Sequence, residues 1–276
     1  MILYPPAKIN MGLSIIEKRP DGFHNIETVF YPIPLCDRLI VETIDKNSNQ
    51  KLEFTCDGLE IPVNEPCNNL CCKAYHLLDA DDQLPPTKIH LRKAIPAGAG
   101  LGGGSSDAAY TLLALNELYQ LRLSFEDLTS YASQIGSDCS FFLLGKPAFG
   151  SGKGDILTPV NLSLAGYHLL LVKPPVFVST AEAYSSVTPK KALNHLPEAL
   201  QAPISEWRYT VFNDFEAPVF SKFPETGRIK ERLYREGAVY AAMSGSGSCI
   251  YGIFEQERTD LLKSFPDCFV WTGKMT

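Results

Sequence analysis

The stretch "AIPAGAGLGGGSSDAA", residues 94–109, decides the fold, because it places bare backbone directly before helix-forming residues. Five glycines stand between Pro96 and Ser106. Glycine is costly to order, so the run is a flexible linker, a tight turn, or a cradle for a ligand that approaches the backbone closely. Linkers join structureless flanks, whereas this run lies between an alternating strand at 87–95 and a strong helix at 105–120. A turn needs fewer glycines, so the sequence favours a cradle.

The cradle has the properties of an anion site. Backbone N–H groups and the positive end of a helix attract phosphate, and Ser105 and Ser106 stand in that helix's first turn. Residues 98–103 match G-x-G-x-x-G, but the acidic residue of a dinucleotide fold is missing, because 117–127 is helix and loop. A Walker A loop needs a lysine, and the sequence has Gly104 followed by two serines. The protein-kinase landmarks His-Arg-Asp and Asp-Phe-Gly are also missing.

Composition narrows the class of protein. The chain has 276 residues and a net charge of -6, which argues against general binding to nucleic acid or anionic membranes. It does not exclude a small phosphorylated ligand. Lys8 interrupts the N-terminus before a signal peptide could form, and no segment is apolar enough to span a membrane. We expect a cytoplasmic protein, monomeric or weakly homodimeric, with a small-molecule substrate and no nucleic-acid or membrane partner.

The eight cysteines are scattered, with no Cys-x-x-Cys pair and no histidine at zinc-ligand spacing. We therefore expect reduced, buried thiols rather than disulfides or a metal site. They are Cys36, Cys56, Cys67, Cys71, Cys72, Cys139, Cys249 and Cys268.

Hydrophobic periodicity and capping residues predict the elements of the first half. Asn69 is a candidate N-cap, and Ser124 with Asp127 forms a capping box. Strands are expected at 8–16, 37–44, 51–56 and 87–95, and helices at 70–80, 105–120 and 125–135; 136–145 is a short helix or strand.

The second half mixes helices and strands without strict alternation. We expect a strand pair at 155–160 and 167–175, helices near 179–188, 205–221 and 224–236, and strands at 238–245, 248–254 and 268–273. This order predicts an α+β protein of two lobes. The Gly/Pro-rich stretch at 150–160 marks the boundary, which gives domains 1–156 and 157–276.

A few other residues could carry chemistry. Lys8 stands in an apolar strand, where a strand-edge lysine reaching solvent is the simpler explanation. Asp138 precedes an apolar run and is either an N-cap or a general base. The loop "MSGSGS", 243–248, is a hairpin turn or an anion-binding loop. Tyr184 fits a helix core, and His24 ends a polar turn, whereas the other histidines are interpreted as structural.

Three motifs in order resemble the GHMP kinase superfamily, the group of galactokinase, homoserine kinase, mevalonate kinase and phosphomevalonate kinase. They are "PAKIN" at 6–10, "IPAGAGLGGGSSDAA" at 95–109 and "MSGSGS" at 243–248. The resemblance implies an N-terminal ATP-binding lobe (1–156) like the second domain of ribosomal protein S5, and a ferredoxin-like C-terminal lobe (157–276). It also implies ATP and Mg²⁺ as cofactors, the latter with unassigned protein ligands.

Two further stretches narrow the resemblance. "RPDGFHNIETVF", 19–30, and "IGSDCSFFLLG", 135–145, are similar to members that use ATP to phosphorylate the 2-hydroxyl of a cytidine diphosphate derivative of methylerythritol, on the route to isoprenoid precursors. The similarity is weakest at 185–212. Two alternatives remain: a homoserine or mevalonate type of kinase, which should lack the PDGFH turn, and a non-enzymatic nucleotide-binding protein of the same fold. A Rossmann oxidoreductase is more distant.

The resemblance also implies roles for individual residues. Asp138 would accept the hydroxyl proton, while Lys8 orients Asp138 and favours the developing alkoxide. The ATP phosphates would be wrapped by Pro96, Ala97, Gly98, Ala99, Gly100, Leu101, Gly102, Gly103, Gly104, Ser105 and Ser106, with Asn69 near the nucleotide.

The acceptor would be bound by a separate set of side chains. Phe23 and Tyr184 would sandwich the cytosine ring, and His24 would read its polar edge. Phe23 replaces a commoner tyrosine, which keeps the stacking and loses any hydroxyl contact. Asn10 and Thr180 would contact the rest of the substrate.

Overall fold

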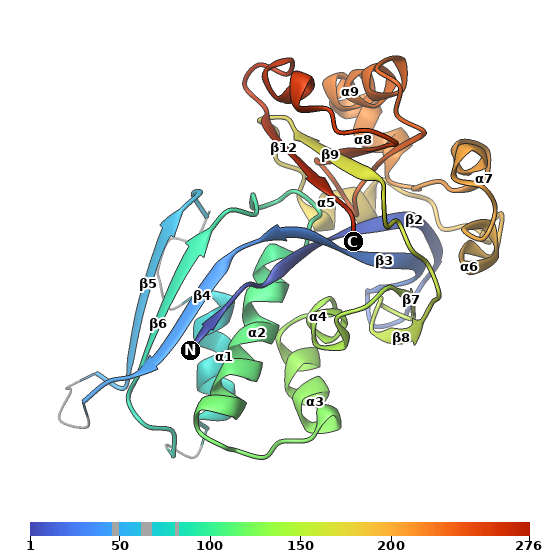
Figure 1. The fold of residues 1–276 in the computed structure, drawn as a ribbon. Coiled ribbons are helices and arrows are strands. Elements are labelled where there is room, and N and C mark those ends of the chain that lie inside the picture. The colour runs from blue at the N-terminus through green and yellow to red at the C-terminus, as the bar shows by residue number, and fades with distance from the viewer. Residues whose placement is uncertain (46–49, 62–67, 81–82) are drawn as a thin grey trace. The chain divides into compact units, whose positions relative to one another are not determined.

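The structure is a computed structural model, and it describes residues 1–45, 50–61, 68–80 and 83–276 (Figure 1). The chain divides into two compact units that interleave along the sequence. The first unit contains residues 1–7, 35–97 and 102–146, and the second contains 8–34, 98–101 and 147–276. The domain boundary expected between 156 and 157 stays a prediction.

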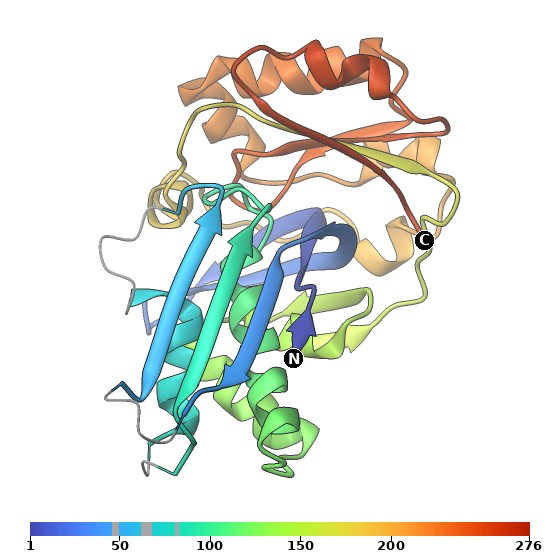
Figure 2. The same cartoon turned by 60° about the vertical axis from the view of Figure 1, so that its left-hand side comes forward.

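The first unit is a four-stranded sheet packed against helices. The sheet has the order β1 (Ile2–Leu3), β4 (Arg38–Thr43), β6 (Thr87–Lys93), β5 (Leu52–Gly58). β5 pairs parallel to β6, and the other neighbours are antiparallel (Figure 2). The helices are α1 (Leu70–Leu78), α2 (Gly103–Leu118), α3 (Phe125–Ile135) and α4 (Cys139–Leu144). Apolar strand residues such as Val41 and Ile89 pack on Tyr75 of α1 and Leu115 of α2.

Local capping signals predicted the helix starts in this unit well. Asn69 Oδ1 accepts a hydrogen bond from Cys71 N at 2.8 Å, which confirms the N-cap of α1. Ser124 and Asp127 form the predicted capping box of α3. α2 begins two residues before the expected start, because Gly103 and Gly104 join its first turn, and 136–145 contains a helix rather than a strand.

The second unit contains two four-stranded sheets. One has the order β2 (Pro6–Lys18), β3 (His24–Cys36), β7 (Ala148–Ser151), β8 (Ile156–Pro159). The other has the order β10 (Tyr240–Met243), β11 (Ile250–Phe254), β9 (His168–Lys173), β12 (Phe269–Lys274), with antiparallel neighbours. β8 therefore pairs with β7 and β9 with β11 and β12, so the expected pairing of 155–160 with 167–175 is wrong. Both segments are strands, but sequence alternation carries no information about the partner.

Helices complete the second unit. Long α9 (Pro224–Arg235) contributes Ile229 and Leu233 to a core shared with Leu170 and Val172 of β9. The same core receives Ile15 from β2. The remaining elements are α5 (Thr180–Ser185), α6 (Leu196–Ala199), η2 (Ile204–Glu206), α7 (Trp207–Thr210), α8 (Glu216–Lys222) and η3 (Thr259–Lys263). Strands and helices are thus mixed in both units, as the α+β prediction requires.

The helix expected at 205–221 is interrupted at Asn213, whose side chain forms hydrogen bonds with the backbone of the 243–248 loop. Its Nδ2 donates to the carbonyl oxygens of Met243 and Gly245, both at 2.8 Å, and its Oδ1 accepts from Phe215 N. The residues around it extend along β2, where Leu13 N donates to Phe212 O at 2.8 Å. The side chain of Asn213 therefore anchors the 243–248 loop.

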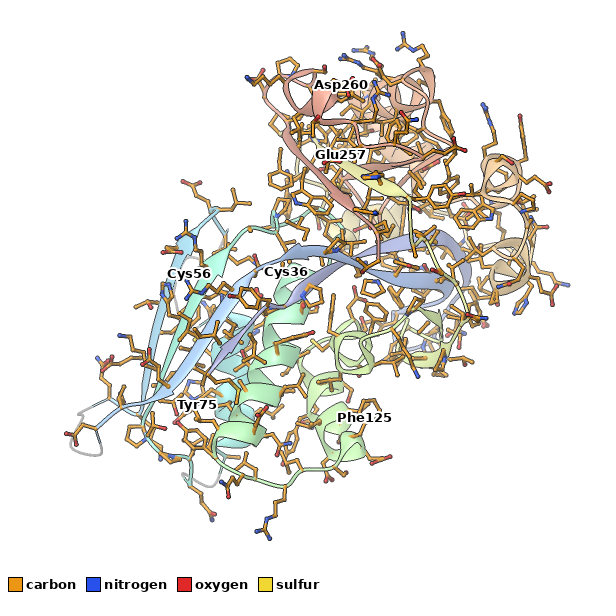
Figure 3. All side chains as sticks on the ribbon, viewed as in Figure 1. Cys36, Cys56, Tyr75, Phe125, Glu257 and Asp260 are labelled. Carbon is orange, nitrogen blue, oxygen red and sulfur yellow. The ribbon has the colours of Figure 1, made fainter. Side chains whose placement is uncertain are left out.

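The cysteines of the described segments are free thiols; Cys67 lies outside these segments. Burial raises the pKa of Cys139 to about 12, so this thiol stays protonated. Figure 3 labels the more accessible Cys36 and Cys56, both in the first unit. None of the helices in the described part of the chain combines the length and apolar character needed to cross a bilayer.

Replacing Asn213 tests the anchoring of the 243–248 loop. Asn213→Ala leaves two carbonyl oxygens without their donor, so we expect the free energy of unfolding to fall by about 2 kcal/mol. Urea denaturation followed by circular dichroism measures it. Asn194→Ala is the control, since this exposed side chain donates a single bond to Thr210 O. Equal midpoints for Asn213→Ala and wild type would contradict the anchoring role.

Candidate functional site

Lys8 is a buried cation on β2 and not a strand-edge lysine reaching solvent. The residue is 3% exposed. Its Nζ donates to Asn10 Oδ1 at 2.5 Å and to Gly100 O at 3.0 Å, and lies 5.3 Å from the Phe30 ring centroid. The simpler sequence interpretation is therefore wrong, because burying an ammonium requires oxygen partners, and β2 and the glycine run supply them.

A network of hydroxyl and amide groups holds these oxygens in place. Asn10 Nδ2 donates to Thr28 Oγ1 at 3.0 Å, which turns the amide oxygen of Asn10 toward Lys8. Ser244 Oγ donates to Gly100 O at 2.8 Å and accepts from Asn10 N at 3.2 Å. Gly100 O thus accepts hydrogen bonds from both Lys8 Nζ and Ser244 Oγ. Sequence reasoning missed Ser244 and Thr28, although it singled out the loop in which Ser244 stands.

The glycine run, residues 96–106, connects β6 to α2 as predicted, and a side chain would clash at Gly98, Gly100 and Gly103. Gly100 has φ +74°, and a Cβ there would lie 2.0 Å from Ser244 O. Gly98 has φ +60°, and its Cβ would lie 2.6 Å from the Phe177 ring. Residues 98–101 belong to the second unit and the rest of the run to the first. The linker interpretation does not fit a segment held this closely.

The first turn of α2 carries the two serines of the proposed cradle. Gly102, with φ +72°, takes the N-cap position without a capping side chain. Ser106 Oγ is buried and has no hydrogen-bond partner among the described residues. Buried hydroxyl groups are normally satisfied, so the hydrogen-bonding capacity of this 0% exposed serine is unused by the described residues. The positive end of a helix is a favourable place for a phosphate.

Asp138 directly precedes α4 and is half-buried. It stands at the N-cap position, but its side chain makes no capping hydrogen bond. The N-cap interpretation of this aspartate therefore has no side-chain hydrogen bond to support it. Asp138 belongs to the first unit and Lys8 to the second, so their pairing stays a prediction, as does the nucleotide contact of Asn69.

The aromatic residues expected at the acceptor lie in the second unit. His24 stacks on Tyr184, with ring centroids 4.9 Å apart and planes at 20°. Tyr184 also contacts Phe215 edge-to-face. Phe23 is 58% exposed, and Lys153 Nζ lies 4.9 Å from its ring centroid. His24 occupies one face of Tyr184, so a base stacking there would have to displace it; the predicted sandwich stays a prediction.

Thr180 begins α5, and its Oγ1 lies 3.4 Å from Ser246 Oγ. The 243–248 loop therefore contacts Thr180, one of the predicted acceptor residues, through Ser246. Through Ser244 it joins the hydrogen-bond network around Lys8. β10 and β11 pair antiparallel on either side of it, so the loop is a hairpin connection. Two of its three serines connect to these residues within one unit: Ser246 contacts Thr180, and Ser244 shares the acceptor Gly100 O with Lys8.

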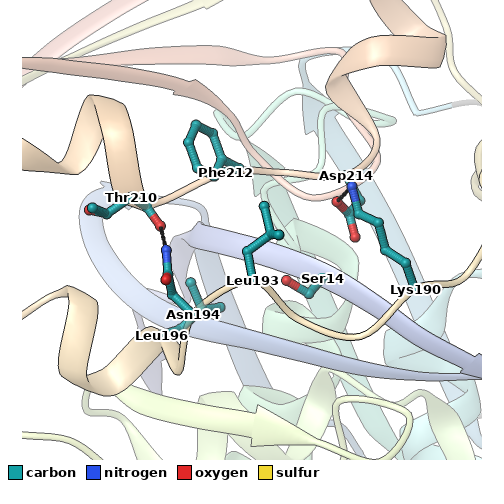
Figure 4. Close-up of a pocket in the computed structure, with 8 residues that line it drawn as sticks. All are labelled: Ser14, Lys190, Leu193, Asn194, Leu196, Thr210, Phe212 and Asp214. Carbon is teal, nitrogen blue, oxygen red and sulfur yellow. Dashed lines mark hydrogen bonds and ion pairs between the residues drawn. The ribbon is translucent and has the colours of Figure 1, made fainter.

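A separate pocket in the second unit belongs to the packing of 190–214 against β2 (Figure 4). Its charged groups are engaged in the fold: Asp214 accepts from Ile15 N at 2.9 Å and pairs with Lys190 at 3.1 Å. None of the predicted site residues lines it. The lining residues are Ser14, Lys190, Leu193, Asn194, Leu196, Thr210, Phe212 and Asp214.

In the described ranges, no group of three His, Cys, Asp or Glu side chains lies close enough together to bind a metal ion. A magnesium ion of a nucleotide complex needs few protein ligands, because phosphate oxygens and water supply most of its coordination. The residues present are compatible with an ion that arrives with its nucleotide.

Comparison with known proteins finds two family models and curated relatives that match this chain. The family model described as GHMP kinases N terminal domain matches residues 69–146, and that described as GHMP kinases C terminal matches 192–268. The chain is 53% identical to the 4-diphosphocytidyl-2-C-methyl-D-erythritol kinase of Bacteroides fragilis, over 100% of both chains.

Solved structures give the same result. A crystal structure of 4-(cytidine 5'-diphospho)-2C-methyl-D-erythritol kinase matches with a TM-score of 0.81 and 34% identity, over 100% of this chain and 99% of the other. The mevalonate kinase of Methanococcus jannaschii shares the fold, with a TM-score of 0.73 and 16% identity over 100% and 98% of the two chains. Two family models and full-length relatives match this sequence, and the chain belongs to the GHMP kinase family.

Proposed function

We propose that the protein phosphorylates the 2-hydroxyl of 4-diphosphocytidyl-2-C-methyl-D-erythritol with ATP, in the methylerythritol phosphate pathway to isoprenoid precursors. The observation that carries this proposal is the 53% identity to a kinase of that name along the entire chain. The second support is Lys8, a buried ammonium held by Asn10 and Gly100 O, because phosphoryl transfer depends on fixed positive charge.

The glycine run supplies the nucleotide site in this proposal. Positions 98, 100 and 102 have positive φ and no side chains, so ATP phosphates can lie against backbone N–H groups. Ser105 and Ser106 add hydroxyl groups at the positive end of α2. Magnesium neutralises charge on the phosphates when bound. Asn69, at the start of α1, would contact the nucleotide.

Transfer then requires a base and a cation. The acceptor hydroxyl oxygen forms a bond to the γ-phosphorus, while the bond from that phosphorus to the bridging oxygen breaks and ADP leaves with the electron pair. Asp138 takes the hydroxyl proton as general base. Lys8 stabilises the charge that develops on the attacking oxygen and orients Asp138. Positioning and electrostatics suffice for this reaction, so a Walker lysine is not needed.

The acceptor would be held by the second unit. The exposed Phe23 ring and Tyr184 offer flat surfaces for cytosine stacking, and His24 offers ring nitrogens for the polar edge of the base. His24 must leave its stack on Tyr184 for the base to enter between the two aromatic rings. Asn10 and Thr180 would bind the remainder of the acceptor.

An acceptor panel tests the proposed reaction. Purified protein with Mg-ATP is incubated with the cytidyl compound, homoserine or mevalonate, and ADP release is followed. We expect ADP release with the cytidyl compound and a product whose phosphate, located by NMR, is on the 2-hydroxyl. Turnover of homoserine or mevalonate without turnover of the cytidyl compound would refute the proposed acceptor.

The general-base role is tested by Asp138→Asn, which preserves size and removes the proton acceptor. We expect kcat to fall by about 10²-fold or more, with ATP affinity largely retained. Asp127→Asn is the control: it changes another carboxylate at a helix start, in the capping box of α3, and should leave kcat unchanged. Near-normal turnover by Asp138→Asn would remove this residue from the mechanism.

A further inference from the structure

A buried ionic cluster in the first unit has no role in the mechanism above. Lys93, the last residue of β6, donates from Nζ to Asp37 Oδ2 and to Asp107 Oδ2, the latter at 2.7 Å. The side chains of Lys93, Asp37 and Asp107 are 3%, 0% and 3% exposed. Three ionisable groups are thus removed from water together.

The cluster contacts both ends of the glycine run. Asp37 Oδ1 accepts from Ala94 N at 2.6 Å and from Ile95 N at 2.9 Å, the two residues directly before Pro96. Asp107 stands early in α2, one residue after the run ends. Lys93 joins the two carboxylates, and its Nζ lies 3.2 Å from where a Cβ on Gly103 would stand. The entry and the exit of the run are therefore fixed to one ammonium group.

Stability alone is a poor explanation for this arrangement. The desolvation free energy of a buried ion pair nearly cancels the attraction between its charges. A protein with apolar side chains in place of the pair is often as stable. Here two carboxylates share one ammonium, and Asp107 Oδ1 has no hydrogen-bond partner among the described residues. Burial raises the pKa of Asp107 to about 8; Lys93 opposes this rise and Asp37 adds to it. A cluster kept for stability would satisfy both carboxylates, so its geometry points to another use.

We propose that Asp37, Lys93 and Asp107 are positioning residues that hold both ends of the glycine run in the shape that binds the ATP phosphates. This inference rests on the proposed kinase function. Asp37 fixes the backbone before Pro96, Asp107 fixes the first turns of α2, and Lys93 sets the distance between them. Loss of the Lys93–Asp107 link lets the start of α2 move relative to β6, which changes the direction of the N–H groups that meet the phosphates.

The test variant is Asp107→Ala. It removes the second carboxylate and leaves a matched Lys93–Asp37 pair, so Lys93 is not left without an anionic partner while α2 loses its link to β6. We expect the dissociation constant of Mg-ATP, measured by calorimetry without acceptor, to rise about ten- to a hundredfold. The KM for the acceptor should not change. Asp107→Asn, whose amide oxygen can still accept from Lys93, should restore the wild-type affinity.

Asp79→Ala is the matched control. This carboxylate is also largely buried in the first unit and accepts from a backbone amide, Leu84 N, at 2.7 Å, but it does not belong to the cluster. It should lower the melting temperature and leave Mg-ATP affinity unchanged. Asp107→Ser, whose hydroxyl is too short to reach Lys93, replaces Asp107→Ala if that variant does not fold.

Wild-type affinity in the folded Asp107→Ala or Asp107→Ser variant overturns the positioning role, as does equal weakening by Asp79→Ala. Because binding is measured without acceptor, the test is separate from that of the proposed reaction. A wild-type protein that binds Mg-ATP and does not phosphorylate the cytidyl compound refutes only the proposed acceptor. A wild-type protein that does not bind Mg-ATP overturns both.

Discussion

The burial of the Lys8 ammonium is the constraint on which the rest of the candidate site depends. A charge buried among apolar side chains must find oxygen partners or destabilise the fold. Asn10 Oδ1 and Gly100 O supply them, and neither is free to move. Thr28 fixes the Asn10 amide, and Ser244 fixes both Asn10 N and Gly100 O. The conformation of the glycine run at Gly100 is thereby tied to the cation.

Gly100 is constrained both by the space around its Cα and by the hydrogen bonds of its carbonyl oxygen. Gly100 has no Cβ because Ser244 O lies where that atom would stand, and its carbonyl is needed by Lys8 and Ser244. In the first unit, Asp37 and Lys93 fix the backbone on the other side of the run. In the proposed function, the ATP phosphates would therefore meet N–H groups whose directions are determined before binding, which lowers the ordering cost of binding.

Local sequence signals predicted the helix starts of the first unit and the position of the glycine run between β6 and α2. Asn69, the Ser124–Asp127 box and the glycine-to-helix transition depend on residues close together in the chain, so their chemistry can be recognised without a structure. The resemblance of the motifs predicted the family correctly. The hydrogen bonds that Gly100 O accepts from Lys8 and Ser244 could not be predicted in the same way, since 92 and 144 residues separate the bonded groups along the chain. For the same reason the ion cluster of Lys93 and Asp37, 56 residues apart, was missed, and the strand pairing of 155–160 was wrong.

The most direct test of the central claim is the single-turnover rate of phosphoryl transfer in Lys8→Met, measured by rapid quench at saturating Mg-ATP and acceptor. Methionine keeps the length of the side chain and removes the charge. If the buried ammonium stabilises the transferring group, the rate falls by about 10²- to 10³-fold in folded protein that still binds Mg-ATP. A rate equal to that of the wild type would contradict the account.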